Sequence, residues 1–153
     1  MIALWMFTPR VVRLIGYRGF AYFYVGSAYA STILDQMLFS RHNERASLGA
    51  SGAVSAVQIL HCLSFPNKKF QIKDIVVSAP EAALIWAVQE ILLLSSDDGV
   101  GHGAHLGGYL FGALVWCWRY VELHGARKVC NEVLDWLFHN LENVLDLAVE
   151  KHL

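Results

Sequence analysis

Apolar residues in this chain gather in blocks whose lengths approach the roughly 20 residues that a helix needs to cross a lipid bilayer. The blocks cover residues 19–38, 49–65, 74–95 and 104–121, and polar segments separate them. Only 16% of the residues are charged, whereas soluble domains carry about 25%. Amphipathic soluble helices would instead spread apolar residues in narrow stripes. We therefore predict an all-α fold, a polytopic transmembrane helix bundle in a multi-pass integral membrane protein.

The basic residues divide unevenly between the two sides that four crossings would create. Of the 12 Lys and Arg residues, only Arg41 and Arg45 fall between the first and second blocks. The others fall in two predicted loops, at 8–18 and 66–73, and from Arg119 onward. A bias of this kind sets orientation, with the basic side normally cytoplasmic or, in a mitochondrion, in the matrix.

Two further segments flank the four blocks. Residues 1–7, MIALWMF, resemble the end of an apolar helix that Thr8-Pro9 would cut off. Residues 129–148 repeat apolar side chains at helical spacing beside a row of acids, which predicts an amphipathic helix on the bilayer or on a partner protein. We expect a membrane domain at 1–121 and a helical tail at 122–153.

A serine and a histidine occupy matching ends of two predicted helices. Ser51 is near the start of block 49–65, and His105 is near the start of block 104–121. One crossing separates these blocks, so the helices would run parallel and begin on the same side. A hydroxyl and an imidazole that meet are the minimum for nucleophilic acyl transfer, with the histidine as base and then as acid.

Glycines flank both side chains at helical spacing. Gly49 and Gly52 would lie on one face of the first helix, and Gly108 and Gly112 would lie below His105 on the other. Small-residue faces let membrane helices approach until their backbones touch. Packing alone explains these glycines but not the serine and histidine at matching ends.

The start of a helix adds a third chemical element. Its first N–H groups have no intrahelical partner, so those of Ala50, Ser51 and Gly52 could receive a developing oxyanion. No carboxylate presents itself to orient His105, which predicts a Ser-His dyad.

Other chemistry has weaker support in the sequence. His102 and His105 could begin a metal site, but there is no HExxH and no third ligand at useful spacing. Glu81 and Glu90 could suggest a proton relay, but they are nine positions apart and would point to opposite faces of one helix. We expect no metal, no cofactor and no nucleic-acid partner.

Two motifs together resemble the rhomboid family of intramembrane serine proteases. They are GASGAVSAV, at 49–57, and HGAHLGG, at 102–108, which resemble the family's GxSG and AHxxG. The mitochondrial presenilin-associated rhomboid-like branch is the most similar. The resemblance implies Ser51 as nucleophile, His105 as base, membrane-protein substrates cleaved in or near a transmembrane helix, and a place in the mitochondrial inner membrane.

The chain also departs from the family pattern. The family core has six spans, so the resemblance implies an N-terminally incomplete chain, whether a fragment or a short form, with the His and Asn that help to hold the oxyanion upstream of Met1. Ser55 stands where bacterial members often carry a tyrosine. A non-catalytic rhomboid-like protein that binds transmembrane helices without cleaving them is the alternative, although inactive relatives usually lose the serine or the histidine.

Overall fold

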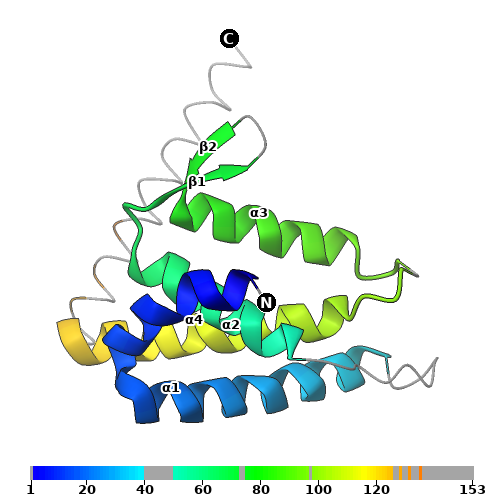
Figure 1. Ribbon diagram of the computed structural model, residues 1–153, viewed down its shortest axis with the longest axis horizontal. Helices are drawn as coiled ribbons and strands as arrows, with labels where there is room; N and C mark the ends of the chain where they lie inside the picture. The colour runs from blue at the N-terminus through cyan, green and yellow to red at the C-terminus, as the bar shows by residue number, and fades with distance from the viewer. Residues whose placement is uncertain are drawn as a thin grey trace. The chain divides into compact units, whose positions relative to one another are not determined.

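The chain is mostly helical, as the sequence predicts. A computed structural model describes residues 2–39, 50–72, 75–96 and 98–125, together with Lys128, Asn131 and Asp135. In chain order the elements are α1 (Ile2–Phe39), α2 (Ser51–Ser64), β1 (Lys69–Ile72), β2 (Ile75–Ser78), α3 (Ala79–Leu92) and α4 (His102–His124) (Figure 1).

Helix α1 joins two parts that the sequence separates. The predicted end of a helix at Phe7 and the predicted basic loop at 8–18 are wrong, because the helix continues through Pro9. Pro9 removes one backbone N–H from the hydrogen-bond ladder, and this loss does not end the helix. The direction changes at Gly16, whose φ of 74° and ψ of 166° suit only glycine.

Helix α2 is the most enclosed helix of unit 1–116. Its sequence is apolar or small nearly all round, which is typical of a buried helix, and most of its residues are buried. It packs against α1 and against α3. Val57 and Leu60 of α2 join Phe7, Val11 and Phe23 of α1 in one core cluster.

The block predicted as one helix from Asp74 to Ser95 is divided between a strand and a shorter helix. Residues 75–78 form β2, which pairs antiparallel with β1 so that Phe70 lies opposite Val77. Helix α3 begins at Ala79, with Pro80 in its first turn. The backbone N–H of Ser78 donates to Oε2 of Glu81 at 2.7 Å, so local capping chemistry decides where this helix starts.

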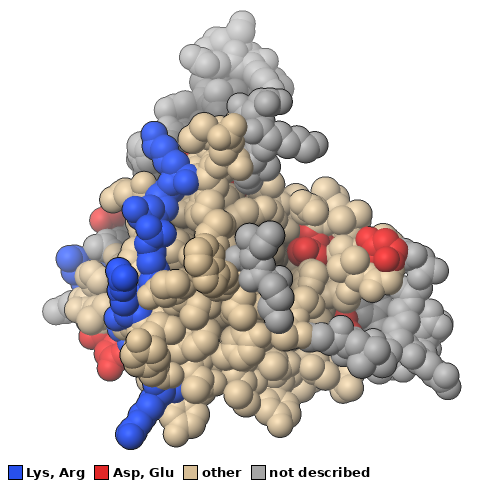
Figure 2. All heavy atoms as spheres, in the orientation of Figure 1, with Lys and Arg blue, Asp and Glu red and all other residues tan. Residues whose placement is uncertain are grey.

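None of the helices within the described ranges combines the length and the apolar character that a membrane crossing requires. The four transmembrane crossings therefore stay a prediction. In Figure 2 the visible Lys and Arg side chains lie along one edge of the face shown. Arg41 and Arg45, which the sequence assigns to the opposite side, lie outside the described residues, so the uneven split of the loop charges and the orientation in a membrane stay predictions as well.

The chain divides into two compact units, residues 1–116 and 117–153. Apart from Asn131 and Asp135, the amphipathic helix predicted at 129–148 lies outside the described residues. The domain boundary predicted after residue 121 stays a prediction.

Candidate functional site

Ser51 is the first residue of α2, and its side chain is exposed. The first backbone hydrogen bond of the helix runs from the N–H of Val54 to the carbonyl of Ala50, at 3.0 Å. The N–H groups of Ser51 and Gly52 precede that bond, so they have no acceptor within the helix. Gly49, which was predicted to begin this helix, lies outside the described residues.

His105 lies in the first turn of α4. Its backbone N–H donates to the carbonyl of Gly101 at 3.1 Å, and its side chain is 17% exposed. The imidazole is therefore held near the surface at the start of a helix, as Ser51 is.

The glycine faces of α2 and α4 are in backbone contact. A Cβ added at Gly52 would lie 2.7 Å from the carbonyl oxygen of Ala104, closer than real Cβ contacts. A Cβ at Gly108 would overlap the carbonyl of Gly52, and one at Gly112 would lie 2.5 Å from the carbonyl oxygen of Ala56. Because Gly52 follows Ser51 and Ala104 precedes His105, the residues that adjoin the two side chains touch each other.

A serine of α1 packs against the same contact. Ser31 is 3% exposed, and a Cβ at Gly52 would lie 2.5 Å from its side chain. Its hydroxyl donates to the carbonyl of Ser27 at 2.6 Å, so the polar group is satisfied within α1. This face was not predicted from the sequence, although small residues at positions 27 and 31, one helical turn apart, are a signal for close packing.

A carboxylate lies beside the His105 imidazole. Oε1 of Glu90, in the last turn of α3, is 3.1 Å from Nδ1 of His105. The expectation that the chain offers no carboxylate to His105 is therefore wrong. Glu81 is exposed at the other end of α3, where it caps the helix, so the two glutamates have separate roles.

The Glu90 carboxylate also contacts His102. Oε2 of Glu90 pairs with Nδ1 of His102, and Nε2 of His102 lies 3.1 Å from Oδ2 of Asp98. Two hydrogen bonds hold the pKa of Asp98 below its ordinary value: the larger effect comes from the Val100 N–H and a smaller one from the His102 imidazole. Glu90, His102 and His105 each offer one ligand atom, all within 4.8 Å of one another, so they could hold a metal ion. Glu90 was not predicted as a third ligand from the sequence.

The structure brings Ser51 and His105 to adjoining helix ends, but within the described ranges no hydrogen bond joins their side chains. Ser55, one turn further along α2, is buried. Its hydroxyl donates to the carbonyl of Ser51 at 3.1 Å. Of these two serines, only Ser51 is exposed.

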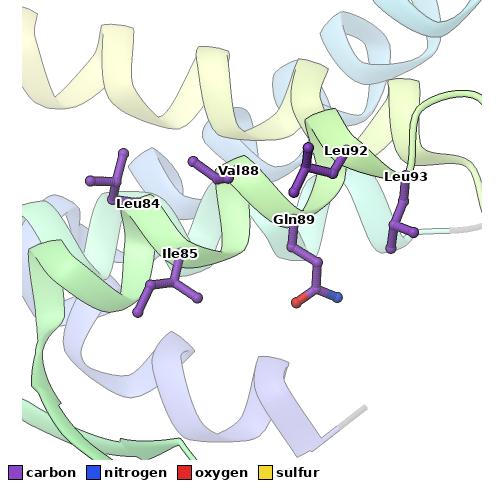
Figure 3. A pocket seen from close by; sticks show the side chains of 6 residues that line it. All are labelled: Leu84, Ile85, Val88, Gln89, Leu92 and Leu93. Atoms are coloured by element: carbon purple, nitrogen blue, oxygen red, sulfur yellow. The ribbon is translucent and has the colours of Figure 1, made fainter.

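The outer surface of α3 carries a shallow hollow with an almost entirely apolar lining (Figure 3). Leu84 and Leu92 are 65% and 75% exposed. The residues that line the hollow are Leu84, Ile85, Val88, Gln89, Leu92 and Leu93.

Comparisons with known proteins agree with the motifs. The family model described as Rhomboid domain matches residues 1–121. The chain is 32% identical over 149 residues to presenilin-associated rhomboid-like protein A, mitochondrial, of Danio rerio, covering 94% of this chain and 38% of the relative. The presenilin-associated rhomboid-like protein, mitochondrial, of Homo sapiens is 27% identical over 151 residues, covering 84% of this chain and 39% of the relative.

The chain thus spans about two fifths of the length of the curated relatives it matches. No solved structure matches it.

Proposed function

Because this chain belongs to the rhomboid family, in its mitochondrial presenilin-associated rhomboid-like branch, we propose that it carries the serine endopeptidase site of an intramembrane protease. Ser51 is the nucleophile and His105 the general base. The observation that carries this proposal is the contact between Gly52 and Ala104, the neighbours of the two side chains.

The proposed reaction transfers an acyl group to Ser51 and then to water. His105 accepts the hydroxyl proton as Oγ of Ser51 attacks the carbonyl carbon of a peptide bond. The resulting imidazolium gives that proton to the amine that leaves as the C–N bond breaks. His105 then takes a proton from water, which attacks the ester, and returns it to Oγ.

The start of α2 supplies donors for the charge that develops on the carbonyl oxygen. The N–H groups of Ser51 and Gly52 have no acceptor within the helix, and the dipole of a helix makes its N-terminus electropositive. A donor of this kind contributes roughly 3 kcal/mol of transition-state stabilisation in serine proteases. The backbone N–H of Ala50, the residue that precedes the helix, is proposed as a further donor to the oxyanion for the same reason.

Glu90 extends the proposed dyad by one positioning residue. A carboxylate within hydrogen-bonding distance of Nδ1 favours the tautomer with the proton on Nδ1 and leaves Nε2 as the base. It also stabilises the imidazolium that forms when His105 accepts the proton of Ser51.

The proposed substrates are membrane proteins, cleaved in or near a transmembrane helix within the lipid bilayer, and the proposed location is the mitochondrial inner membrane. Large exposed apolar side chains support a site embedded in lipid, because soluble monomers rarely expose large contiguous apolar patches. On α1 and α3 they include Trp5, Tyr17, Tyr22, Leu84, Ile91 and Leu92.

A second candidate function is the binding of transmembrane helices without cleavage. The exposed apolar hollow on α3 favours it, because such a surface suits a helix of the same character. The retained serine and histidine favour the protease.

An activity-based fluorophosphonate probe tests the proposal in detergent-solubilised protein. We expect the probe to label the chain on Ser51 and the S51A variant to lose the label. S55A is the matched control, because Ser55 lies one turn away and is buried; it should keep the label.

Labelling that persists in S51A would refute the assignment of the nucleophile. If the chain captures a model transmembrane helix without any labelling, the binding function replaces the protease.

A further inference from the structure

Two imidazoles and one carboxylate converge where α3 ends and α4 begins. Glu90 extends one oxygen to Nδ1 of His102 and the other to Nδ1 of His105, the latter at 3.1 Å. The side chains are 13%, 5% and 17% exposed, in the order Glu90, His102 and His105. The three are thus largely withdrawn from water, and one ligand atom of each lies within 4.8 Å of the others.

This donor set matches a three-ligand zinc site. Zinc with two His and one Glu keeps a fourth position for water or another small ligand. Calcium and magnesium prefer oxygen donors throughout, so two imidazole nitrogens favour zinc among the abundant divalent cations. The ligands come from two helices, whose backbones fix them before the ion arrives.

Asp98 supplies the outer support that such sites have. Its Oδ2 lies 3.1 Å from Nε2 of His102, the nitrogen that faces away from Glu90. A ligating histidine typically donates its second N–H to a carboxylate, which orients the ring and raises its basicity. Glu90 and Asp98 together also carry two negative charges, which balance those of the ion.

We propose that Glu90, His102 and His105 form a Zn²⁺ site whose occupation switches off the base of the catalytic dyad. The inhibitory part of this proposal rests on the proposed function, whereas the metal site does not. Zinc takes the lone pair of Nδ1 of His105, and the proton that Nδ1 carried moves to Nε2. An imidazole protonated on Nε2 cannot accept the proton of Ser51, so nucleophilic attack stops until the ion leaves.

The first test measures Zn²⁺ binding directly. The chelator-treated chain, purified in detergent, is titrated with Zn²⁺ in competition with a chromophoric chelator. We expect one ion per chain, and we expect E90Q, H102Q and H105Q each to weaken binding by at least about 10- to 100-fold. H124Q is the matched control, because His124 lies on α4 with its Nδ1 3.0 Å from the carbonyl of Tyr120; it should bind zinc as the wild type does.

A second measurement does not depend on variants that fold. Co²⁺ added to the wild-type chain should give the intense visible absorption of tetrahedral coordination, and Zn²⁺ should displace it. Weak octahedral absorption, or zinc affinity that is equal in the wild type and in the three ligand variants, would overturn the metal site.

Probe labelling of Ser51 separates inhibition from binding. Zn²⁺ should block labelling, a chelator should restore it, and H102Q should need more zinc for the same block. Labelling unaffected by bound zinc would overturn the switch and leave the site. No labelling in metal-free protein would count against the proposed function, while the titration still decides the site.

Discussion

Replacing Gly112 by alanine tests whether the contact between α2 and α4 sets the distance between Ser51 and His105. A Cβ at Gly112 would lie 2.5 Å from the carbonyl oxygen of Ala56, whereas ordinary contacts begin at 3.4 Å. The helices must therefore separate by the difference, about 0.9 Å, at this level. Gly112 lies seven positions after His105, about two turns along the helix, so the change leaves the proposed catalytic groups themselves intact.

The expected effect follows from that displacement. Shifting reacting groups by about 1 Å can lower turnover by roughly 100-fold, and overpacking a close contact costs about 1–3 kcal/mol of stability. We expect G112A to react with the fluorophosphonate probe on the order of 10- to 100-fold more slowly than the wild type. The rate of Ser51 labelling and the helical circular dichroism are measured together.

Gly19 of α1 offers a matched control. Its added Cβ would meet nothing closer than the Cβ of Ile15, at 3.4 Å, so G19A should label at the wild-type rate. If G112A also labels at the wild-type rate with its helices intact, the contact does not position the two side chains and the reasoning fails.

Four other changes give separate tests. E90Q should slow labelling of Ser51 by up to about 100-fold, because His105 loses its carboxylate; an unchanged rate would remove Glu90 from the mechanism. G16A should lower the free energy of unfolding by roughly 1–3 kcal/mol, because Gly16 holds a backbone conformation open only to glycine; an unchanged melting temperature would contradict this. S78A should speed hydrogen exchange at the start of α3, because it removes the side-chain half of the capping box that Ser78 forms with Glu81 and so weakens the cap by about 1 kcal/mol; equal protection would refute the cap. Single cysteines at Asn67 and Asp98, in a chain without its own cysteines, should react from opposite sides of a membrane; reaction from one side would remove the predicted crossing between them.

The helices that carry the proposed dyad could be predicted closely from the sequence. Blocks 49–65 and 104–121 became α2, at 51–64, and α4, at 102–124, because continuous apolar runs with glycine faces favour buried helices. The same reasoning failed at 74–95. The apolar run IVVS, at 75–78, is equally compatible with the start of a helix, and its pairing with KFQI, at 69–72, makes it a strand. Pro80 lies in the first turn of α3, where proline is common because it has no N–H to leave unpaired.

The acid beside His105 could not be found from spacing. Glu90 and His105 are on different helices, and the way in which the chain between α3 and α4 returns decides whether they meet. Helical periodicity separated Glu90 from Glu81 and gave no information about a contact across that turn. An acid near the end of one helix, shortly before a histidine-rich start of the next, was the available signal.

The most direct test of the central claim asks whether Ser51 and His105 react as a pair. A mechanism-based isocoumarin acylates a serine and then alkylates a histidine within reach, which joins the two residues covalently. After proteolysis, mass spectrometry should find one cross-linked species that contains both Ser51 and His105, and H105Q should yield none. A reagent bound to Ser51 at the same rate in H105Q, or a cross-link to His102 in its place, would contradict the account.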